Sequence, residues 1–476
     1  GEVIQRLHGH VLDVVEHAAA DVHEDALAHA VDHHRLGDVE DRGQGDARHV
    51  AQGEDPDRVQ PLVRPPGGQV PVDDDLQDVG LGQLRGVDEE DHQQAEQEGL
   101  ELRPEELGPF LESKAFYGLN VTIPYKKAVI PYCQELTPQA QRIGSVNTIV
   151  RREDGTLLGH NTDYDGFAWM LRSAGAQVTG KKALILGTGG VSLTVKTVLE
   201  DLGAGEIVFI SRSGEDNYEN LDRHADAQII VNATPVGMYP NTDASPVDLS
   251  RFPQLEGAFD LIYNPARTRF LLQAEERGLC RANGLGMLVA QAKAAAELFL
   301  GVRLLDSKVE EISGAMEKET RNLLLIGMPG CGKSTVGRAL AERLRRQLVD
   351  LDELIERETV RSIPDIFARE GEVYFRRLEH DALCRVARES GLVIAAGGGI
   401  VTQPDNLAPM RQNSTVIFLK RDVSLLPVEG RPVSQANNLQ ELYRRRLPLY
   451  EAACDLEVEN HRVEDTVKEI IRRLGL

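Results

Sequence analysis

The 476-residue sequence has few cysteines, few aromatic residues and no long apolar run. Its five cysteines lie far apart and form no Cys-x-x-Cys pair, so neither a disulfide framework nor a zinc site is indicated. No stretch of about 18 apolar residues could span a bilayer, and the chain does not open with a basic segment followed by an apolar one. These absences predict a cytoplasmic protein without a membrane partner.

Positive charge is also scarce, because the net charge is −23. A phosphate backbone is bound by an excess of Lys and Arg, so nucleic acid is not expected as a partner. Much of the negative charge lies in residues 1–100, which carry 24 Asp and Glu against seven Arg and no Lys. At roughly 150 residues per domain, the length predicts about three folding units, and the oligomeric state stays open.

Residues 1–100 form an acidic, histidine-rich, low-complexity segment that lacks Ser, Thr, Asn, Met and every aromatic residue. Such a set offers little to fill a core, so we expect disorder or poorly packed helix. Every residue here except Ile4 is an amino acid with at least one codon that begins with G or C. A GC-rich gene shows this bias at the third base of its codons, so finding the bias at the first base suggests DNA read on the opposite strand or out of frame. Nine of the 13 histidines lie here; a metal-binding tract is the alternative, although the histidine spacing is irregular.

From residue 101 onward, segments of strand-like and helix-like period alternate, as is typical of parallel α/β domains. Lys182 to Leu186 is expected to be a buried strand, and Gly187-Thr-Gly189-Gly190 then leads into a helical stretch from Val191 to Leu202. Glycines allow the backbone to approach a pyrophosphate, and a helix N-terminus supplies N–H donors. Close-packed turns also use such glycines, so the loop alone leaves a structural role open.

A second strand, Glu206 to Ile210, is followed by Ser211 and Arg212, where NAD-binding proteins usually carry an acidic residue. An arginine there can pair with the 2′-phosphate of NADP, which favours NADP over NAD; a solvated arginine is the other interpretation. Six further motifs occur in order. They are Asn120-Val-Thr122-Ile-Pro124-Tyr-Lys126, Gly144-Ser-Val-Asn147-Thr148, Asn161-Thr162-Asp163, Asn232-Ala-Thr234-Pro-Val-Gly237-Met238, Asp260-Leu-Ile-Tyr263-Asn264-Pro265, and Asn283-Gly284 through Gln291-Ala292.

Together these motifs resemble shikimate dehydrogenase over residues 101 to about 305. The resemblance implies that NADPH reduces the ketone of 3-dehydroshikimate to shikimate, with Lys126 and Asp163 as the acid-base pair. An ammonium beside a carboxylate suits this role, because hydride arriving at a carbonyl carbon builds negative charge on oxygen. The implied substrate contacts are Thr122, Asn147, Asp163, Tyr263 and Gln291, and the implied cofactor contacts are Gly187, Gly189, Gly190, Ser211, Arg212, Thr234 and Met238.

The sequence departs from this family at one point. The family carries a Ser-x-Ser motif, whose hydroxyls hold the substrate carboxylate, ahead of the Asn-Val-Thr motif. No serine precedes Ser113, so we expect the substrate domain to lack its first part. Two lost hydroxyl contacts to a carboxylate cost roughly 1.5 to 3 kcal/mol each, and an exposed sheet edge adds to this, so weak or absent dehydrogenase activity is expected.

A second nucleotide motif follows the apolar strand Asn322 to Ile326. Gly327-Met-Pro-Gly330-Cys331-Gly332-Lys333-Ser334 fits the phosphate-binding loop pattern, in which backbone N–H groups cradle the phosphates of ATP. Lys333 reaches the β- and γ-phosphates, and Ser334 ligates Mg²⁺. The expected nucleotide contacts are Gly327, Gly330, Gly332, Lys333, Ser334 and Thr335.

The acceptor side is indicated by Asp350-Leu-Asp352, Gly371 to Arg376, Gly397-Gly398-Gly399 and Arg446-Leu-Pro448-Leu-Tyr450. These motifs resemble shikimate kinase over residues 320–476. Arg376 and Arg446 can fork onto a carboxylate, and the glycines after the strand Leu392 to Ala396 admit a ring next to main chain. The resemblance implies that Asp352 accepts the proton of the attacking hydroxyl, that Gly398 lines the substrate site, and that Asp350 reaches Mg²⁺ through water. Arg431 lies where the family keeps a lid arginine.

We therefore predict a fusion of two consecutive steps of aromatic amino-acid biosynthesis with 3-dehydroshikimate and shikimate as substrates and NADP(H), ATP and Mg²⁺ as cofactors. The expected fold is a Rossmann-type NADP-binding domain with a partial substrate domain, then a P-loop kinase domain with a parallel sheet. The expected boundaries are 101–175 for the partial substrate domain, 176–284 for the NADP-binding part, 285–305 for C-terminal helices, 306–319 for a linker and 320–476 for the kinase. Another small-molecule kinase, such as a gluconate kinase, and a non-enzymatic shikimate or nucleotide sensor are the alternatives.

Overall fold

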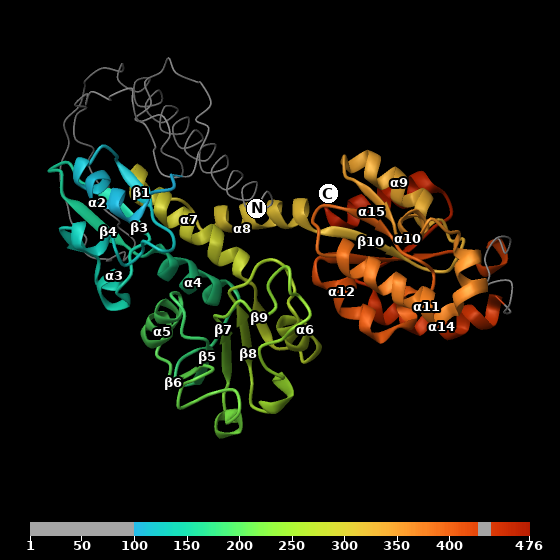
Figure 1. The fold of residues 1–476 in the computed structure, drawn as a ribbon, viewed down its shortest axis with the longest axis horizontal. Helices are drawn as coiled ribbons and strands as arrows, with labels where there is room; N and C mark the ends of the chain where they lie inside the picture. The colour runs from blue at the N-terminus through green and yellow to red at the C-terminus, as the bar shows by residue number, and fades with distance from the viewer. Residues whose placement is uncertain (1–99, 427–438) are drawn as a thin grey trace, which may run out of the picture.

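The computed structural model describes residues 100–426 and 439–476 of the chain. Figure 1 shows two α/β halves side by side, with helix α8 running between them. The expectations for residues 1–99, including the histidine tract, lie outside the described residues, as does Arg431.

The first sheet is small and mixed. Its order is β1-β3-β4-β2, with β1 and β4 antiparallel to β3 and with β2 parallel to β4. Leu111, Phe116 and Ile149 are buried in the core beneath it. The elements of this region are α2 (Pro104–Ser113), β1 (Gly118–Asn120), β2 (Glu135–Leu136), α3 (Pro138–Ile143), β3 (Thr148–Arg151), β4 (Leu157–His160) and α4 (Thr162–Ser173), with a 3-10 turn at Ile130–Tyr132.

The second sheet is fully parallel and has the order β6-β5-β7-β8-β9. Apolar cores lie on both of its faces. The strands of such a sheet are buried on both sides, which is why their sequences are almost continuously hydrophobic. Its elements are β5 (Lys182–Leu186), α5 (Ser192–Asp201), β6 (Glu206–Ile210), β7 (Ile229–Asn232), β8 (Gly257–Asp260), α6 (Arg269–Glu276) and β9 (Cys280–Ala282), with 3-10 turns at Leu221–His224 and Leu249–Arg251. The strands β5 and β6 have the predicted bounds.

Two helices follow the second sheet and lead to the other half. Helix α7 (Gly284–Leu300) packs against α4, and α8 (Ser307–Thr320) packs on α7 through Val309, Ile312 and Met316, all buried. The polar stretch expected as a linker at 306–319 is therefore a packed helix. The spacing of these three apolar residues in the sequence could have predicted the helix, because positions three and four apart share one helix face.

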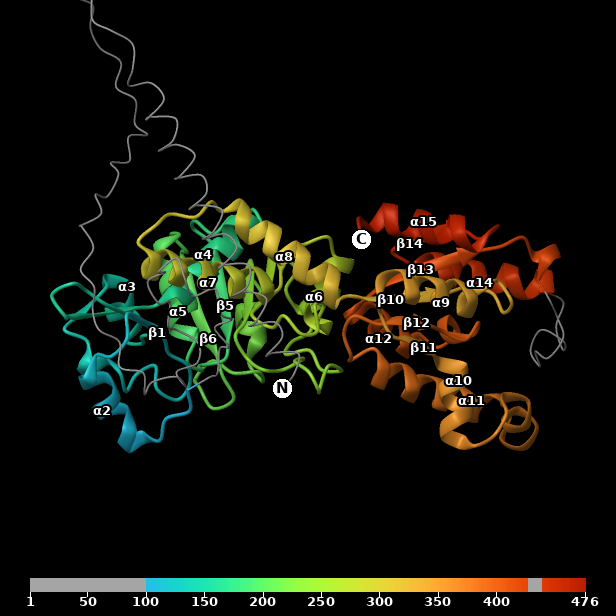
Figure 2. The same cartoon turned by 90° about the horizontal axis from the view of Figure 1, so that it is seen from above.

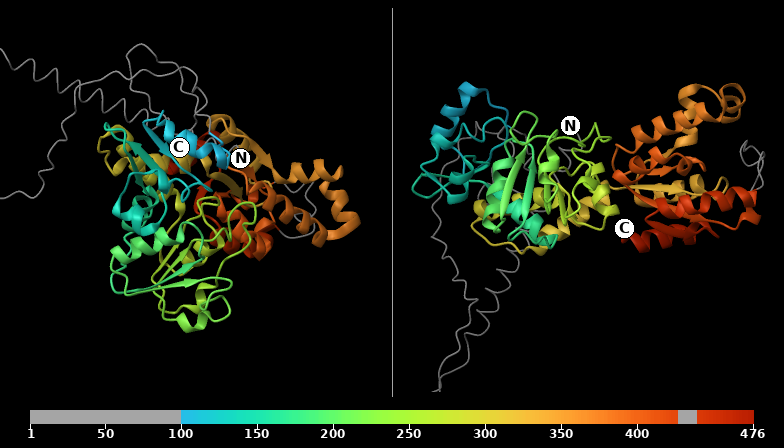
Figure 3. Two further views of the ribbon diagram at one scale, coloured as in Figure 1. Left: turned by 60° about the vertical axis from the view of Figure 1, so that its left-hand side comes forward. Right: turned by 90° about the horizontal axis from the view of Figure 1, so that it is seen from below.

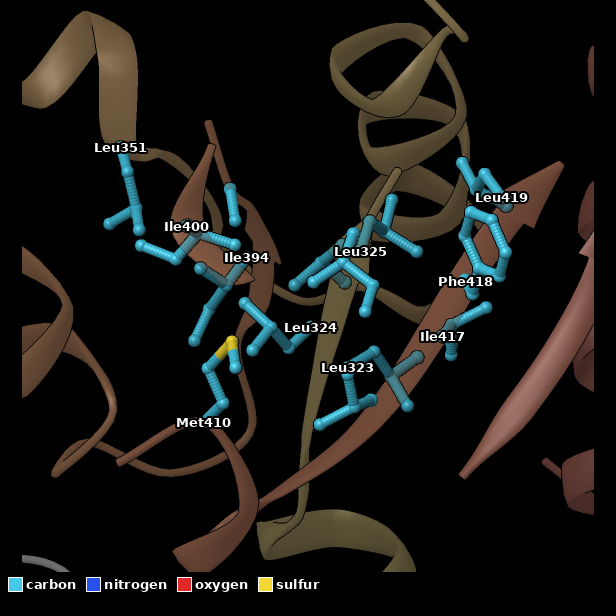
Figure 4. Packing of buried hydrophobic residues seen from close by; sticks show 14 of the residues in the cluster. Leu323, Leu324, Leu325, Leu351, Ile394, Ile400, Met410, Ile417, Phe418 and Leu419 are labelled. Atoms are coloured by element: carbon cyan, nitrogen blue, oxygen red, sulfur yellow. The ribbon is translucent and has the colours of Figure 1, made fainter. Parts of the chain in front are cut away.

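The third sheet is also parallel, with the order β11-β12-β10-β13-β14. Figure 4 shows its apolar centre, where Leu324 of β10 lies toward Ile394 of β12 and Leu323 of β10 lies toward Ile417 of β13. The elements are β10 (Asn322–Ile326), α9 (Lys333–Leu344), β11 (Leu348–Asp350), α10 (Leu351–Thr359), α11 (Ile363–Val386), β12 (Val393–Ala395), α12 (Leu407–Gln412), β13 (Ser414–Lys420), α14 (Leu439–Ala453), β14 (Leu456–Glu459) and α15 (Val463–Leu474), with 3-10 turns at Ile400–Thr402, Pro404–Asn406 and Val423–Leu425.

The two parallel sheets confirm the predicted α/β fold class for both halves. Figure 2 shows α7 within the first half and α9, α14 and α15 in the second, and Figure 3 shows the same two halves from two further directions. No helix within residues 100–426 and 439–476 combines the length and apolar character that crossing a bilayer requires.

Candidate active sites

Lys126 and Asp163 form an ion pair at the border of the first sheet. The distance from Lys126 Nζ to Asp163 Oδ2 is 2.7 Å, and both side chains keep some exposure, 28% and 11%. Asp163 lies in the first turn of α4, where the positive end of the helix dipole favours a carboxylate. Lys126 is therefore paired with the predicted partner, 37 residues away, and is not an isolated surface lysine.

Two other predicted substrate contacts lie around this pair. Asn147 Oδ1 accepts hydrogen bonds from the Thr162 backbone N–H and hydroxyl, which leaves its Nδ2 as the atom available to a substrate oxygen. A Cβ on Gly166, one turn after Asp163, would lie 2.6 Å from the Met287 carbonyl oxygen and 3.2 Å from Gln291 Cβ. This close approach of α4 and α7 brings Gln291 beside the turn that carries Asp163. Thr122 is exposed near Lys126.

Tyr263 lies elsewhere in this half. It is half-buried against the core of α7 and α8 and lines a small cavity together with Asn264, Leu285 and Glu317. Burial raises the pKa of its phenol. No described contact joins Tyr263 to Lys126 or Asp163, so its assignment as a substrate contact stays a prediction.

The glycine loop after β5 is open toward solvent. Gly187 has φ +101°, and a Cβ there would lie 2.8 Å from Thr234 Cγ2, so this position needs glycine. Gly189 and Gly190 are exposed, and a Cβ on either would meet no atom within 4 Å. The open backbone before α5 fits a pyrophosphate, and the loop lies at the strand-order switch between β5 and β7.

The other predicted cofactor contacts lie at neighbouring strand ends. Ser211 and the exposed Arg212 follow β6, whose last residue accepts a hydrogen bond from Gly187 N–H. Thr234 and Met238 follow β7, and Met238 is 45% exposed. A cation beside the glycine loop fits the extra phosphate of NADP.

A buried carboxyl holds the loop that carries Thr234, and sequence reasoning did not single it out. Asp260 accepts hydrogen bonds from Asn232 Nδ2 at 3.0 Å and from the Thr268 hydroxyl at 2.6 Å. Asn232 Oδ1 in turn accepts from the Thr234 hydroxyl at 2.6 Å. Burial raises the pKa of Asp260 to about 7. Asp260 opens the motif Asp260-Leu-Ile-Tyr263-Asn264-Pro265, but only the fold reveals that its side chain is buried.

The second phosphate-binding loop has the predicted strand, loop and helix around it. Gly327, Gly330 and Gly332 have φ values of +144°, +82° and +100°, which only glycine adopts readily. Lys333 is buried, and its Nζ donates to the carbonyls of Gly327 and Met328 at 3.0 and 3.1 Å. This hydrogen bonding holds the lysine within the loop. Thr335 is exposed in the first turn of α9.

Ser334 and Asp350 meet beside the loop, as a shared Mg²⁺ site requires. The Ser334 hydroxyl donates to Asp350 Oδ2 at 2.5 Å. Asp350 Oδ1 caps α10 by accepting from the Asp352 and Glu353 N–H groups, which fixes the carboxylate. A hydroxyl beside a fixed carboxylate is the oxygen set that Mg²⁺ takes in such proteins.

Asp352 and Glu379 face Gly397 at the end of β12. A Cβ on Gly397 would lie 2.2 Å from Glu379 Oε1 and 2.9 Å from Asp352 Oδ1. Both of these oxygens are buried and lack a hydrogen-bond partner among the described residues. Burial, together with the charges of Glu379 and Asp350, raises the pKa of Asp352 to about 6. Unsatisfied buried oxygens next to an open backbone fit a ligand that donates hydroxyl protons.

Arg376 and Arg446 converge on the same glycine segment. A Cβ on Gly399 would lie 2.2 Å from Arg376 Nη2, and Arg446 Nη1 donates to the Gly398 carbonyl at 3.0 Å. Both arginines are buried. A Cβ on Gly398 would lie 2.6 Å from Pro329 of the phosphate-binding loop, so the glycine segment separates the two arginines from that loop by one layer of backbone.

Glu379 is a further site residue that sequence reasoning missed. It is fully buried, and its Oε2 accepts from Arg376 Nη1 at 2.6 Å. Glu372 also accepts from Arg376 Nη2, at 3.0 Å. The spacing of Arg376 and Glu379 on one helix was the available signal, because residues three apart share a face.

These two sites define a nucleotide-dependent oxidoreductase half joined to a P-loop phosphotransferase half. Residues 87–149 match the family model described as shikimate dehydrogenase substrate binding domain, and residues 329–475 match the one described as shikimate kinase. Shikimate dehydrogenase (NADP(+)) from Clostridium perfringens (strain 13 / Type A) is 38% identical over 208 residues, 41% of this chain and 76% of that protein. The chain belongs to the shikimate dehydrogenase family, and residues 329–475 carry a shikimate kinase domain.

Other relatives are similar to the same part of the chain. Shikimate dehydrogenase (NADP(+)) from Moorella thermoacetica (strain ATCC 39073 / JCM 9320) is 36% identical over 231 residues, which cover 43% of this chain and 78% of that protein. A solved chorismate mutase/shikimate 5-dehydrogenase fusion protein from Clostridium acetobutylicum is 36% identical, with a TM-score of 0.44, and covers 46% of this chain and 86% of its own. The resemblance inferred from the motifs is confirmed for both halves.

Proposed function

We propose that this chain catalyses two consecutive reactions of the shikimate pathway. The first half reduces 3-dehydroshikimate to shikimate with NADPH, and the second half phosphorylates the 3-hydroxyl of shikimate with ATP and Mg²⁺. The observation that carries the kinase assignment is the convergence of Arg376, Arg446 and Asp352 on the glycine segment beside the phosphate-binding loop.

In the dehydrogenase half, bound NADPH supplies the hydride. Lys126 lies where it can donate a proton to the oxygen that becomes the hydroxyl, and the ammonium stabilises the negative charge that develops there. Asp163, 2.7 Å from Lys126 Nζ, orients the ammonium group. Asn147 Nδ2 and Gln291 are the neutral hydrogen-bonding partners that align the substrate ring.

In the kinase half, the two arginines hold the substrate carboxylate. Asp352, with its pKa raised to about 6, is ionised at neutral pH and can accept the proton of the attacking hydroxyl. Glu379 keeps Arg376 in place, because its buried oxygen binds Nη1. Lys333 stabilises the transferring phosphate, and Ser334 and Asp350 hold Mg²⁺, whose charge offsets that of the phosphates.

The dehydrogenase half is expected to turn over weakly. Residues 1–112 contain no serine, so this stretch cannot supply the pair of hydroxyls that holds the substrate carboxylate in this family. Each missing charge-assisted hydrogen bond costs roughly 1.5 to 3 kcal/mol of substrate binding. The substrates are small molecules; a cytoplasmic location and the absence of a nucleic-acid partner stay predictions.

Separate assays of the two reactions on the full chain test this function. Shikimate-dependent ADP release at ordinary kinase rates supports the kinase assignment, and NADPH oxidation with 3-dehydroshikimate supports the dehydrogenase assignment. Phosphorylation of gluconate in place of shikimate contradicts the first, and turnover at the rate of a normal shikimate dehydrogenase contradicts the expected weakness. An absence of both reactions with retained binding favours a sensor.

A further inference from the structure

The two halves of the chain meet at the amino end of the kinase sheet. Gln412 ends α12, and Asn413 precedes β13. Their side chains are almost fully buried, with 4% and 7% exposed. Buried amides need hydrogen-bond partners, and these two find most of theirs in the dehydrogenase half.

The first loop that they hold follows β8. Asn413 Oδ1 accepts from the Ala266 N–H at 2.9 Å, and the Gln412 carbonyl accepts from the Arg267 N–H at 2.9 Å. Asn413 Nδ2 also donates to Asn264 Oδ1 at 3.3 Å. Three residues within the four-residue stretch 264–267 are thus bound by the kinase half.

Arg267 adds a charged anchor to this loop. Its Nε donates to the Arg411 carbonyl at 2.7 Å, and its Nη2 donates to the Ser414 carbonyl at 2.7 Å. Asp455, near the start of β14, lies 3.2 Å from Nη1. The guanidinium therefore reaches two kinase strands, which fixes the direction of the loop more firmly than apolar contact would.

The second loop that the kinase half holds follows β7. Gln412 Nε2 donates to the Thr242 carbonyl at 2.7 Å. This loop also contains Thr234 and Met238, which are predicted cofactor contacts. The two loops are also joined directly, because the Tyr239 N–H donates to the Asn264 carbonyl at 3.1 Å.

A continuous set of hydrogen bonds leads from these contacts to the cofactor loop. Thr268, next to Arg267, donates to Asp260 Oδ2, Asn232 donates to Asp260 Oδ1, and Thr234 donates to Asn232. All three of Thr268, Asp260 and Asn232 are fully buried. A shift of the loop after β8 would therefore reach Thr234 through groups that have no water to replace their partners.

We propose that Gln412 and Asn413 of the kinase half are positioning residues for the cofactor site of the dehydrogenase half. They act by holding the loops after β7 and β8. This inference rests on the proposed NADPH-dependent function. It implies that the dehydrogenase half depends on its fusion partner for cofactor affinity.

The test uses the full chain and the variants Gln412→Met and Asn413→Leu, which keep most of the side-chain volume and remove the amide. The matched control is Gln347→Met, at an exposed glutamine just before β11. Two readouts are measured: NADPH affinity from the fluorescence of the reduced nicotinamide, and hydrogen exchange of the amides from Thr234 to Thr242 and at Ala266 and Arg267. The kinase constants of each variant report on its folding.

We expect Gln412→Met and Asn413→Leu to weaken NADPH binding about fivefold or more, in the usual range for coupled sites. Exchange in both loops should rise, with kinase constants and the control unchanged. If the variants bind NADPH as tightly as the parent chain does, the inference is overturned, whether or not hydrogen exchange in the loops rises. Weaker NADPH binding without faster exchange in the loops also overturns it. If the parent chain binds no NADPH, the proposed dehydrogenase function fails, and unchanged exchange in the loops then also overturns the positioning role.

Discussion

Lys126 Nζ lies 2.7 Å from Asp163 Oδ2, and this ion pair joins the turn after β1 to the first turn of α4. The two residues are 37 positions apart, so the fold, and not local sequence, brings them together. The pair is partly buried, and such an ion pair is weak evidence for stability because the cost of removing its charges from water offsets their attraction, so a chemical role is the better reason for this geometry.

Lys126→Met is expected to lower the dehydrogenase kcat by about 100-fold or more, because a positioned proton donor contributes roughly 10² to 10⁴ in rate. NADPH affinity should stay unchanged. The adjacent exposed lysine supplies the control, since Lys127→Met should have no effect. Steady-state NADPH oxidation measures both, and equal losses from the two substitutions would assign Lys126 no special role.

The kinase rate should depend on the ionisation of Asp352. Because its pKa is raised to about 6, kcat/KM for shikimate is expected to rise with pH through that value and to level off above it. A pH profile of ADP release measures this. A profile that is flat between pH 5 and 8 would contradict the role of Asp352 as proton acceptor.

The same carboxyl should destabilise the fold before substrate binds. The folded state binds the Asp352 proton at a higher pH than the unfolded chain does, so stability from this group falls as pH rises from about 4 to about 6. Asp352→Asn is therefore expected to stabilise the ligand-free protein at pH 7 by roughly 1 to 3 kcal/mol while abolishing phosphorylation. Chemical denaturation checks the stability; a destabilised variant would show that the carboxylate is structural.

Arg376→Lys is expected to raise the KM for shikimate about tenfold to 100-fold, because a lysine cannot make the two parallel hydrogen bonds of a guanidinium. The lysine keeps the positive charge beside buried Glu379, so the fold should survive. The matched control on the same helix is Arg369→Lys, at an exposed ion pair with Asp365. Initial rates at varied shikimate and fixed ATP make the comparison, and a change in the ATP constants alone would contradict the assignment.

Substitutions at two neighbouring glycines should affect the substrate site and the nucleotide site differently. A Cβ on Gly399 would displace Arg376, so Gly399→Ala is expected to raise the KM for shikimate tenfold or more, whereas a Cβ on Gly398 meets Pro329, so Gly398→Ala should affect ATP as well. Gly314→Ala, in open space on α8, is the control and should be neutral or stabilising. Indistinguishable kinetics for the first two variants would argue against this layering.

The motifs predicted much of the fold, because the strand that feeds each glycine loop is an uninterrupted apolar run. The bounds of β5, β6 and β10 match the expected residues. The linker boundaries stay a prediction, but the helical form of this stretch was not predicted, because charged residues on the outer face of α8 hid the buried stripe of Val309, Ile312 and Met316.

The site was less completely predictable from sequence. Lys126, Asp163, Arg376 and Arg446 stand in motifs that the sequence displays. Asp260 acts through its burial, which only the fold reveals, and Glu379 was overlooked although it lies one helical turn from Arg376. The contacts of Gln412 and Asn413 with loops more than 140 residues earlier could not be foreseen either, because they depend on how the two halves dock.

The most direct test of the account is phosphoryl transfer by the full chain with ATP, Mg²⁺ and either shikimate or gluconate, with the product identified by NMR. The account predicts shikimate 3-phosphate at about 1 to 100 turnovers per second, no reaction with gluconate, and loss of most activity at low shikimate in Arg376→Lys. Phosphorylation of gluconate, or shikimate phosphorylation that is indifferent to Arg376, would contradict it.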